Sequence, residues 1–272
     1  MNKITFYFSI LKFVLLNPKA GKNLLDSKYH ISQDVKKADS IYNYASKKSE
    51  FNEILHSLFP NSTYSITNFR ESILDLQLHT KGFLEKLQRE EYPSRSKPYP
   101  VEYTLDNESG EFLYILCKLI KPDKVIETGV AYGLSSMYIL QALNENKKGT
   151  LYSIDSVFLP WQSKEMIGAA IPDHLRKNWK LILGPSSNKL RNLLNSLQSI
   201  DIFFHDSLHT SKNMTFEFET SWPFIKDKGF LLSDDISSNN AFYEFYTKLK
   251  LEPKILPQKS NLGSFLGILQ KP

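Results

Sequence analysis

The sequence has a single cysteine, Cys117, in 272 residues. One thiol cannot form an intramolecular disulfide framework or a cysteine-rich zinc site, so protein classes that depend on either are excluded. The apolar neighbours of Cys117 predict that it packs in a core. The rest of the composition, with 41% hydrophobic, 13% aromatic and 23% charged residues, is that of a globular protein with a sizeable core.

No apolar run is long enough to cross a membrane. The most apolar stretch, residues 4–16, contains Lys12 and is shorter than the roughly 20 residues that a spanning helix needs. No small-residue cleavage site follows Asn17 and Pro18, which argues against a signal peptide. We expect residues 4–16 to form a docking or homo-oligomerisation helix, and weak contact with a membrane surface stays open. We expect the protein to be cytoplasmic.

The sequence also has no dense run of basic residues, although its formal net charge is +5. Residues 1–100 have 15 Lys and Arg against 10 Asp and Glu, whereas residues 101–272 have 19 of each. Domains that bind nucleic acids usually have a basic patch, so the balanced second part of the chain disfavours a nucleic-acid partner and nucleic-acid methylation.

Three prolines between residues 92 and 100 indicate a linker or a wrapping loop. Before it, residues 31–92 have apolar side chains at three- and four-residue intervals, interrupted at residues 60–62, which predicts helices. We therefore divide the chain into a helical N-terminal region, residues 1–100, and a second domain, residues 101–272. The N-terminal region is expected to act as a lid, in substrate selection or in oligomerisation.

Helical and strand patterns alternate beyond residue 105. Parallel strands are predicted at residues 125–128, 151–155, 180–184, 200–205 and 230–233, and a hairpin at residues 254–256 and 264–269. Helices are predicted at residues 108–119, 134–144, 190–197 and 216–224. This alternation predicts an α/β fold, with a doubly wound, mostly parallel, seven-stranded sheet and a C-terminal antiparallel hairpin at its edge.

The first predicted strand runs directly into a glycine-bearing turn and then a helix, in residues 124–136. Gly129 and Gly133 allow tight backbone dihedrals and a close approach to a ligand. The helix that follows begins with free N–H groups, which can bind polar or anionic groups. Such a turn, at the carboxyl end of a parallel strand, predicts a pocket for a nucleotide-type cofactor.

Every predicted parallel strand is followed by polar or ligand-capable residues. They are Glu127, Asp155, Gly184 to Ser187, His205 with Asp206, and Asp234 with Asp235, in strand order. Because parallel strands end at one edge of a sheet, we expect these groups to converge there. Each one taken singly could instead be a helix cap or a turn residue. Their occurrence after all five strands predicts one site.

These features resemble the class I S-adenosylmethionine-dependent methyltransferases, especially the metal-dependent O-methyltransferases of the catechol type and of antibiotic sugar pathways. The resemblance covers about residues 105–272 and implies S-adenosylmethionine as the cofactor and a hydroxyl of a small molecule, such as a sugar or another polyhydroxylated compound, as the acceptor. It implies a cofactor site made of Glu127, Gly129, Tyr132, Gly133, Ser135, Asp155, Gly184, Ser186, Ser187 and Asp206. Within it, Glu127 would hold the cofactor's ammonium group, Ser135 its carboxylate and Asp155 both ribose hydroxyls.

The same resemblance implies a metal site. Asp206, Asp234 and Asp235 would bind Mg²⁺ or a similar divalent cation, which prefers oxygen ligands. His209 lies three residues after Asp206 and would be the general base, so that His209 and Asp206 form the catalytic set. A surface histidine in a loop is the alternative for His209.

Two other interpretations of the domain stay open. An NAD(P)-dependent dehydrogenase also has a glycine turn and an acid after its second strand, but its fingerprint needs G-x-G-x-x-G, and Gly129 and Gly133 do not have that spacing. A non-catalytic binding module with the same fold is the second, because a fold does not determine a function.

Overall fold

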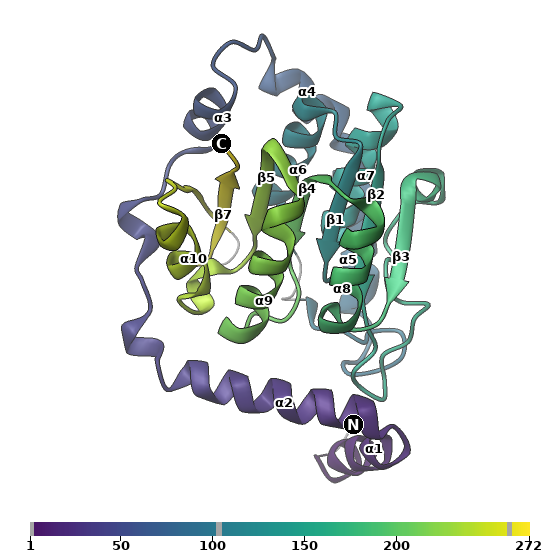
Figure 1. Ribbon diagram of the computed structural model, residues 1–272. Coiled ribbons are helices and arrows are strands. Elements are labelled where there is room, and N and C mark those ends of the chain that lie inside the picture. The colour runs from purple at the N-terminus through teal and green to yellow at the C-terminus, as the bar shows by residue number, and fades with distance from the viewer. Residues whose placement is uncertain (1–2, 102–104, 260–262) are drawn as a thin grey trace.

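A computed structural model describes residues 3–101, 105–259 and 263–272 of the chain (Figure 1). Its centre is one seven-stranded sheet in the order β3-β2-β1-β4-β5-β7-β6. The strands are β1 (Lys124–Thr128), β2 (Thr150–Asp155), β3 (Trp179–Leu183), β4 (Ile200–His205), β5 (Ile225–Ser233), β6 (Lys254–Pro257) and β7 (Phe265–Gln270). Strands β1 to β5 pair in parallel, and β7 pairs antiparallel with β5 and β6. The predicted doubly wound fold with its C-terminal hairpin is confirmed.

The first strand explains why both faces of the sheet are covered. Val125 and Ile126 are both fully buried, but they belong to different apolar clusters. Successive side chains of a strand point to opposite faces, so a run of apolar residues requires a layer of helices on each side. On one face lie α6 (Asn107–Ile120) and α7 (Leu134–Asn146); on the other lie α8 (Ser186–Leu197), α9 (Ser211–Ser221) and α10 (Ala241–Leu249) (Figure 1).

Several element boundaries differ from the prediction. Strand β5 begins at Ile225 rather than at Phe230, because the polar residues 226–228 hide the strand pattern in the sequence. Helix α9 begins at Ser211 rather than at Phe216, because the side chain of Thr210 accepts a hydrogen bond from the backbone N–H of Asn213 and so caps the helix.

The N-terminal region contains α1 (Lys3–Leu16), α2 (Pro18–Val35), α3 (Phe51–Leu58), α4 (Ile66–Ser72) and α5 (Leu74–Gln88). Residues 36–50 form only two short 3₁₀ turns where the apolar spacing predicts a helix, because Tyr44 is buried against Phe242 and its neighbours instead of pairing along a helix. Phe51, Ile54 and Leu76 are buried in the same cluster as α6 and α7, so α3 and α5 share the core of the sheet domain.

Helices α1 and α2 lie outside that core, beyond the edge where the parallel strands end (Figure 1). Asp34 of α2 accepts a hydrogen bond of 2.8 Å from the backbone N–H of Ser211, at the start of α9. The ring of Phe6 in α1 lies 5.0 Å from that of Trp161, in the segment after β2. Among the described residues, no helix is long and apolar enough to cross a membrane.

Candidate functional site

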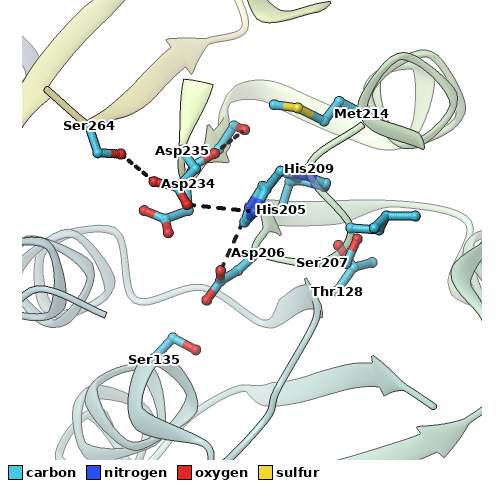
Figure 2. A network of polar contacts seen from close by, with 12 residues as sticks. Thr128, Ser135, His205, Asp206, Ser207, His209, Met214, Asp234, Asp235 and Ser264 are labelled. Carbon is cyan, nitrogen blue, oxygen red and sulfur yellow. Dashed lines mark hydrogen bonds and ion pairs between the residues drawn. The ribbon is translucent and has the colours of Figure 1, made fainter. Parts of the chain in front are cut away.

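The carboxyl ends of β4 and β5 bring four predicted site residues together. Asp206, His209 and Asp234 each present one ligand atom, and these atoms all lie within 4.8 Å of one another (Figure 2). His209 Nε2 is 3.9 Å from Asp206 Oδ1, and His209 Nδ1 is 3.7 Å from Asp235 Oδ2. Three aspartates were predicted as metal ligands, but the structure groups His209, rather than Asp235, with Asp206 and Asp234. We call these four residues the acidic cluster.

The charges of the acidic cluster oppose one another. Burial and the neighbouring Asp234 raise the pKa of Asp206 well above its usual range. Burial and Asp235 raise the pKa of Asp234 to about 8. Burial, together with His205, lowers the pKa of His209 to about 4, so its imidazole is neutral at neutral pH. A divalent cation would relieve the repulsion, and the carboxylate oxygens with a neutral imidazole are suitable donors for it.

The C-terminal hairpin holds the pair of adjacent aspartates in place. Gln258, just after β6, donates a hydrogen bond from Nε2 to Asp234 Oδ1. Ser264, just before β7, donates from Oγ to Asp235 Oδ1 (Figure 2). The backbone N–H of Gln258 also donates to the carbonyl of Ser264 at 3.0 Å. Sequence reasoning missed these two residues, because only the pairing of β6 with β7 and of β7 with β5 brings them to the site.

A buried polar network lies beneath the cluster. His205 Nδ1 is 2.6 Å from Glu217 Oε2, and both side chains are fully buried. Thr128 Oγ1 donates to Glu217 Oε2 at 2.5 Å, and Ser207 Oγ donates to Oε1 at 2.9 Å. The ring of His205 meets that of His209 edge to face, with centroids 5.2 Å apart. Glu217 therefore connects the end of β1, the end of β4 and the loop after β4 around the cluster. Glu217 was not identified from the sequence, and the only sign of its role there was a glutamate between two phenylalanines.

Glu127 is fully buried at the end of β1, away from any open surface. Ser135 Oγ donates to its Oε1 at 2.5 Å, and Ser136 and Ser153 donate to its Oε2 at 2.6 and 2.7 Å. Burial raises the pKa of Glu127 to about 7, although the three hydroxyls oppose the shift. In this structure Glu127 and Ser135 bind each other, and their predicted contacts with a cofactor stay predictions.

Asp155, at the end of β2, holds the glycine turn. Its Oδ2 accepts hydrogen bonds of 2.9 Å from the backbone N–H groups of Val130 and Ala131, and its Oδ1 accepts one from Ser156. A carboxylate has about four lone-pair sites, so roughly one remains on Oδ1. Asp155 could then accept one ribose hydroxyl without releasing the turn, whereas the predicted contact with both would need a rearrangement.

Tyr132 faces the N-terminal region instead of the strand ends. Its hydroxyl donates to the carbonyl of Tyr99 at 2.8 Å and accepts from the backbone N–H of Tyr99 at 3.2 Å. The hydroxyl of Tyr99 is buried and has no hydrogen-bond partner among the residues that the structure describes, and burial and the charge of Asp155 both raise its pKa. A buried donor without a partner among the described residues could be satisfied by a polar ligand, and Tyr99 lies close enough to Asp155 to feel its charge, so Tyr99 is a site candidate that the sequence did not indicate.

The other predicted cofactor residues lie around the same rim. Gly129 and Gly133 have φ values of 82° and 90°, and Gly184 has 134°. Gly133 packs against Gly168 and Ile171, so its lack of a Cβ serves contacts within the protein. Ser186 and Ser187 lie before the helix predicted at residues 190–197, but they form the first turn of α8, because the backbone has already turned at Gly184 and Pro185.

Comparisons with known proteins agree with this fold. Residues 126–236 match the family described as a methyltransferase domain. The O-methyltransferase TomG from Streptomyces achromogenes, involved in tomaymycin synthesis and solved with S-adenosylmethionine, has a TM-score of 0.54 at 14% identity, covering 70% of this chain and 90% of that one. An O-methyltransferase from Bacillus cereus, solved with S-adenosylhomocysteine, has a TM-score of 0.53 at 14% identity, covering 80% and 97%.

A methyltransferase from Podospora anserina, with S-adenosylhomocysteine bound, has a TM-score of 0.51 at 15% identity, covering 81% of this chain and 95% of that one. The search of curated proteins gives no match. At sequence identities this low, the structural similarity supports the fold alone. The matched residues 126–236 extend from β1 to the residues just after β5. Residues 126–236 therefore match a methyltransferase domain, and the chain has the fold of these solved methyltransferases, as its sequence predicted.

Proposed function

We propose that the protein transfers a methyl group from S-adenosylmethionine to a hydroxyl of a small molecule, such as a sugar or another polyhydroxylated compound, with the help of a divalent cation. The observation that carries the proposal is the acidic cluster at the carboxyl ends of β4 and β5, next to the turn after β1. Two O-methyltransferases among the similar structures support the type of acceptor atom.

The rim around Asp155 suits the cofactor. The three hydrogen bonds that Asp155 accepts from described residues leave about one of its lone-pair sites for a ribose hydroxyl, and the hydroxyl of Tyr99, without a partner among the described residues, offers a donor. S-adenosylmethionine, when bound, supplies an electrophilic methyl group on a positively charged sulfur. The protein's part is to hold that methyl group in line with the acceptor oxygen.

Asp206, Asp234 and Asp235 are the proposed ligands of a cation such as Mg²⁺. The cation, when bound, supplies a Lewis acid that lowers the pKa of a coordinated hydroxyl. His209 is the proposed general base. Its imidazole is neutral at neutral pH, because burial lowers its pKa, and is therefore available to accept a proton; it lies within 4 Å of the carboxylates of Asp206 and Asp235, and the charge of Asp235 opposes the lowering of its pKa.

Calorimetry with S-adenosylmethionine, S-adenosylhomocysteine and NAD tests the cofactor first. We expect binding of the two sulfur compounds; binding of NAD alone would overturn the proposal in favour of a dehydrogenase. Radiolabelled methyl transfer to a panel of hydroxylated compounds, sugars first, then tests the reaction. Cofactor binding without transfer to any acceptor would favour the non-catalytic binding module.

Two variants test the cation and the base. Asp234→Asn should abolish binding of Mg²⁺ and reduce kcat, whereas Asp227→Asn, an exposed aspartate on β5, should change neither. His209→Asn should lower kcat by about 10² or more, the usual contribution of a general base, with cofactor affinity retained. Full activity in His209→Asn would remove His209 from the mechanism, and transfer that resists chelation would remove the cation.

The remaining expectations stay predictions. We propose that the N-terminal region covers the site as a lid, since α2 contacts the start of α9 next to His209. The cytoplasmic location, the homo-oligomer and the lack of a nucleic-acid partner have no test in the structure.

A further inference from the structure

Helix α1 exposes large apolar side chains on one face. Tyr7, Phe8, Leu11 and Leu15 have 65%, 66%, 56% and 72% of their surfaces exposed. At 3.6 residues per turn, these four positions fall within an arc of about 100°. Apolar side chains gathered in this way indicate an interaction surface, whereas single exposed ones would not.

The apolar surface continues onto α2. Leu25 and Tyr29 are 64% and 58% exposed, and they line, with Leu15, a hollow of about 630 Å³ between the two helices. Gly21 makes this arrangement possible, because an added Cβ there would lie 2.6 Å from a methyl group of Val14. We call α1 and α2 together the helix pair.

The helix pair and the two lysines that follow it, Lys36 and Lys37, together contain the whole charge excess of the chain. Residues 1–37 have seven lysines, two aspartates and no arginine or glutamate, a difference of +5. The complete sequence has 34 Lys and Arg against 29 Asp and Glu, also +5, so residues 38–272 have 27 of each and are balanced. An apolar face with surrounding lysines is the combination that binds an anionic lipid surface.

We propose that the helix pair docks the protein on the surface of an anionic bilayer, with the apolar face of α1 among the lipid headgroups and the lysines next to the negative charges. The charges argue against a second copy of the chain as the occupant, because the helix pair has five lysines and two aspartates, and two helix pairs would bring +3 against +3. Docking would also place the carboxyl edge of the sheet near the bilayer, since the helix pair contacts Trp161 and Ser211 at that edge.

Vesicle sedimentation with the full chain tests the proposal. The protein should bind vesicles of phosphatidylglycerol and phosphatidylcholine, bind vesicles of phosphatidylcholine alone at least about tenfold more weakly, and dissociate in high salt. Leu11→Glu with Leu15→Glu should weaken binding by about tenfold or more. Lys19→Glu with Lys22→Glu, which leaves the apolar face intact, should also weaken it.

The matched control is Leu78→Glu, which places the same acidic group on an equally exposed leucine, 66% exposed, of α5. It should bind vesicles as the unchanged protein does, and circular dichroism should show that all variants are folded. The proposal is overturned if the unchanged protein does not bind anionic vesicles, or if the Leu11 and Leu15 changes leave binding intact. A dimer in sedimentation velocity that these changes dissociate, without vesicle binding, would assign the face to a second copy instead.

Discussion

The backbone of Gly129 lies directly against the carbonyl group of Asp206: a Cβ at position 129 would be 1.9 Å from that oxygen. Asp206 also donates a backbone hydrogen bond of 2.8 Å to the carbonyl of Thr128. The turn after β1 and the loop after β4 are thus fitted to each other at the point where Asp206 enters the acidic cluster. The glycine that was predicted to let a ligand approach is needed for this contact inside the protein.

We predict that Gly129→Ala destabilises the fold and weakens cation binding. The φ of 82° disfavours any Cβ, and the collision with Asp206 adds an overpacking cost, so a loss of about 3 kcal/mol is expected in urea unfolding. Displacement of Asp206 should lower the affinity for Mg²⁺ in calorimetry. Gly82→Ala is the control: nothing lies within 4 Å of its added Cβ in α5, and it should stabilise by about 0.5–1 kcal/mol. Unchanged stability and affinity in Gly129→Ala would contradict the prediction.

The sequence predicts the sheet and the convergence of its polar ends, because both follow from local patterns. Runs such as Val125 and Ile126 require cover on both faces, and parallel strands must end at one edge. Asp206 and Asp234 could be placed together for that reason alone. His209 could be placed near them because a loop of three residues cannot go far from Asp206.

The parts of the site that escaped prediction depend on long-range packing. Gln258 and Ser264 reach the two aspartates only through the hairpin of β6 and β7. Tyr99 lies in a proline-rich segment whose path no local pattern determines. The role of Glu127 was also not visible, because the sequence cannot show that three serines would surround its carboxylate.

Glu217→Gln should destabilise the protein and loosen the loop after β4. Burial alone would raise the pKa of Glu217, but His205 and the hydrogen-bond donors hold it below the usual value. Glu217 is therefore a carboxylate in the folded protein at neutral pH. Glutamine would replace one carboxylate oxygen of this buried hydrogen-bond network by an NH₂ group, and leaving a buried partner unsatisfied costs about 1–3 kcal/mol. Glu219→Gln, two residues on, removes only an exposed pair with Lys248 and should change stability by less than about 1 kcal/mol. Equal effects of the two substitutions in urea unfolding would show that the pair with His205 is not structural.

Glu127→Gln should change how stability depends on pH. Because the folded pKa of about 7 exceeds the ordinary value of 4.5, the folded state holds a proton that the unfolded state releases, and stability is highest below 4.5 and falls as the pH rises to about 7. At 1.36 kcal/mol per pKa unit, the loss approaches roughly 3 kcal/mol above neutral pH. Glutamine stays neutral, so thermal unfolding between pH 4.5 and 8.5 should show a smaller decline for Glu127→Gln, while Glu85→Gln, on the exposed side of α5, should follow the unchanged protein. Parallel curves for all three proteins would mean that Glu127 is ionised at neutral pH in the folded state, with the hydroxyls of Ser135, Ser136 and Ser153 fully compensating its burial.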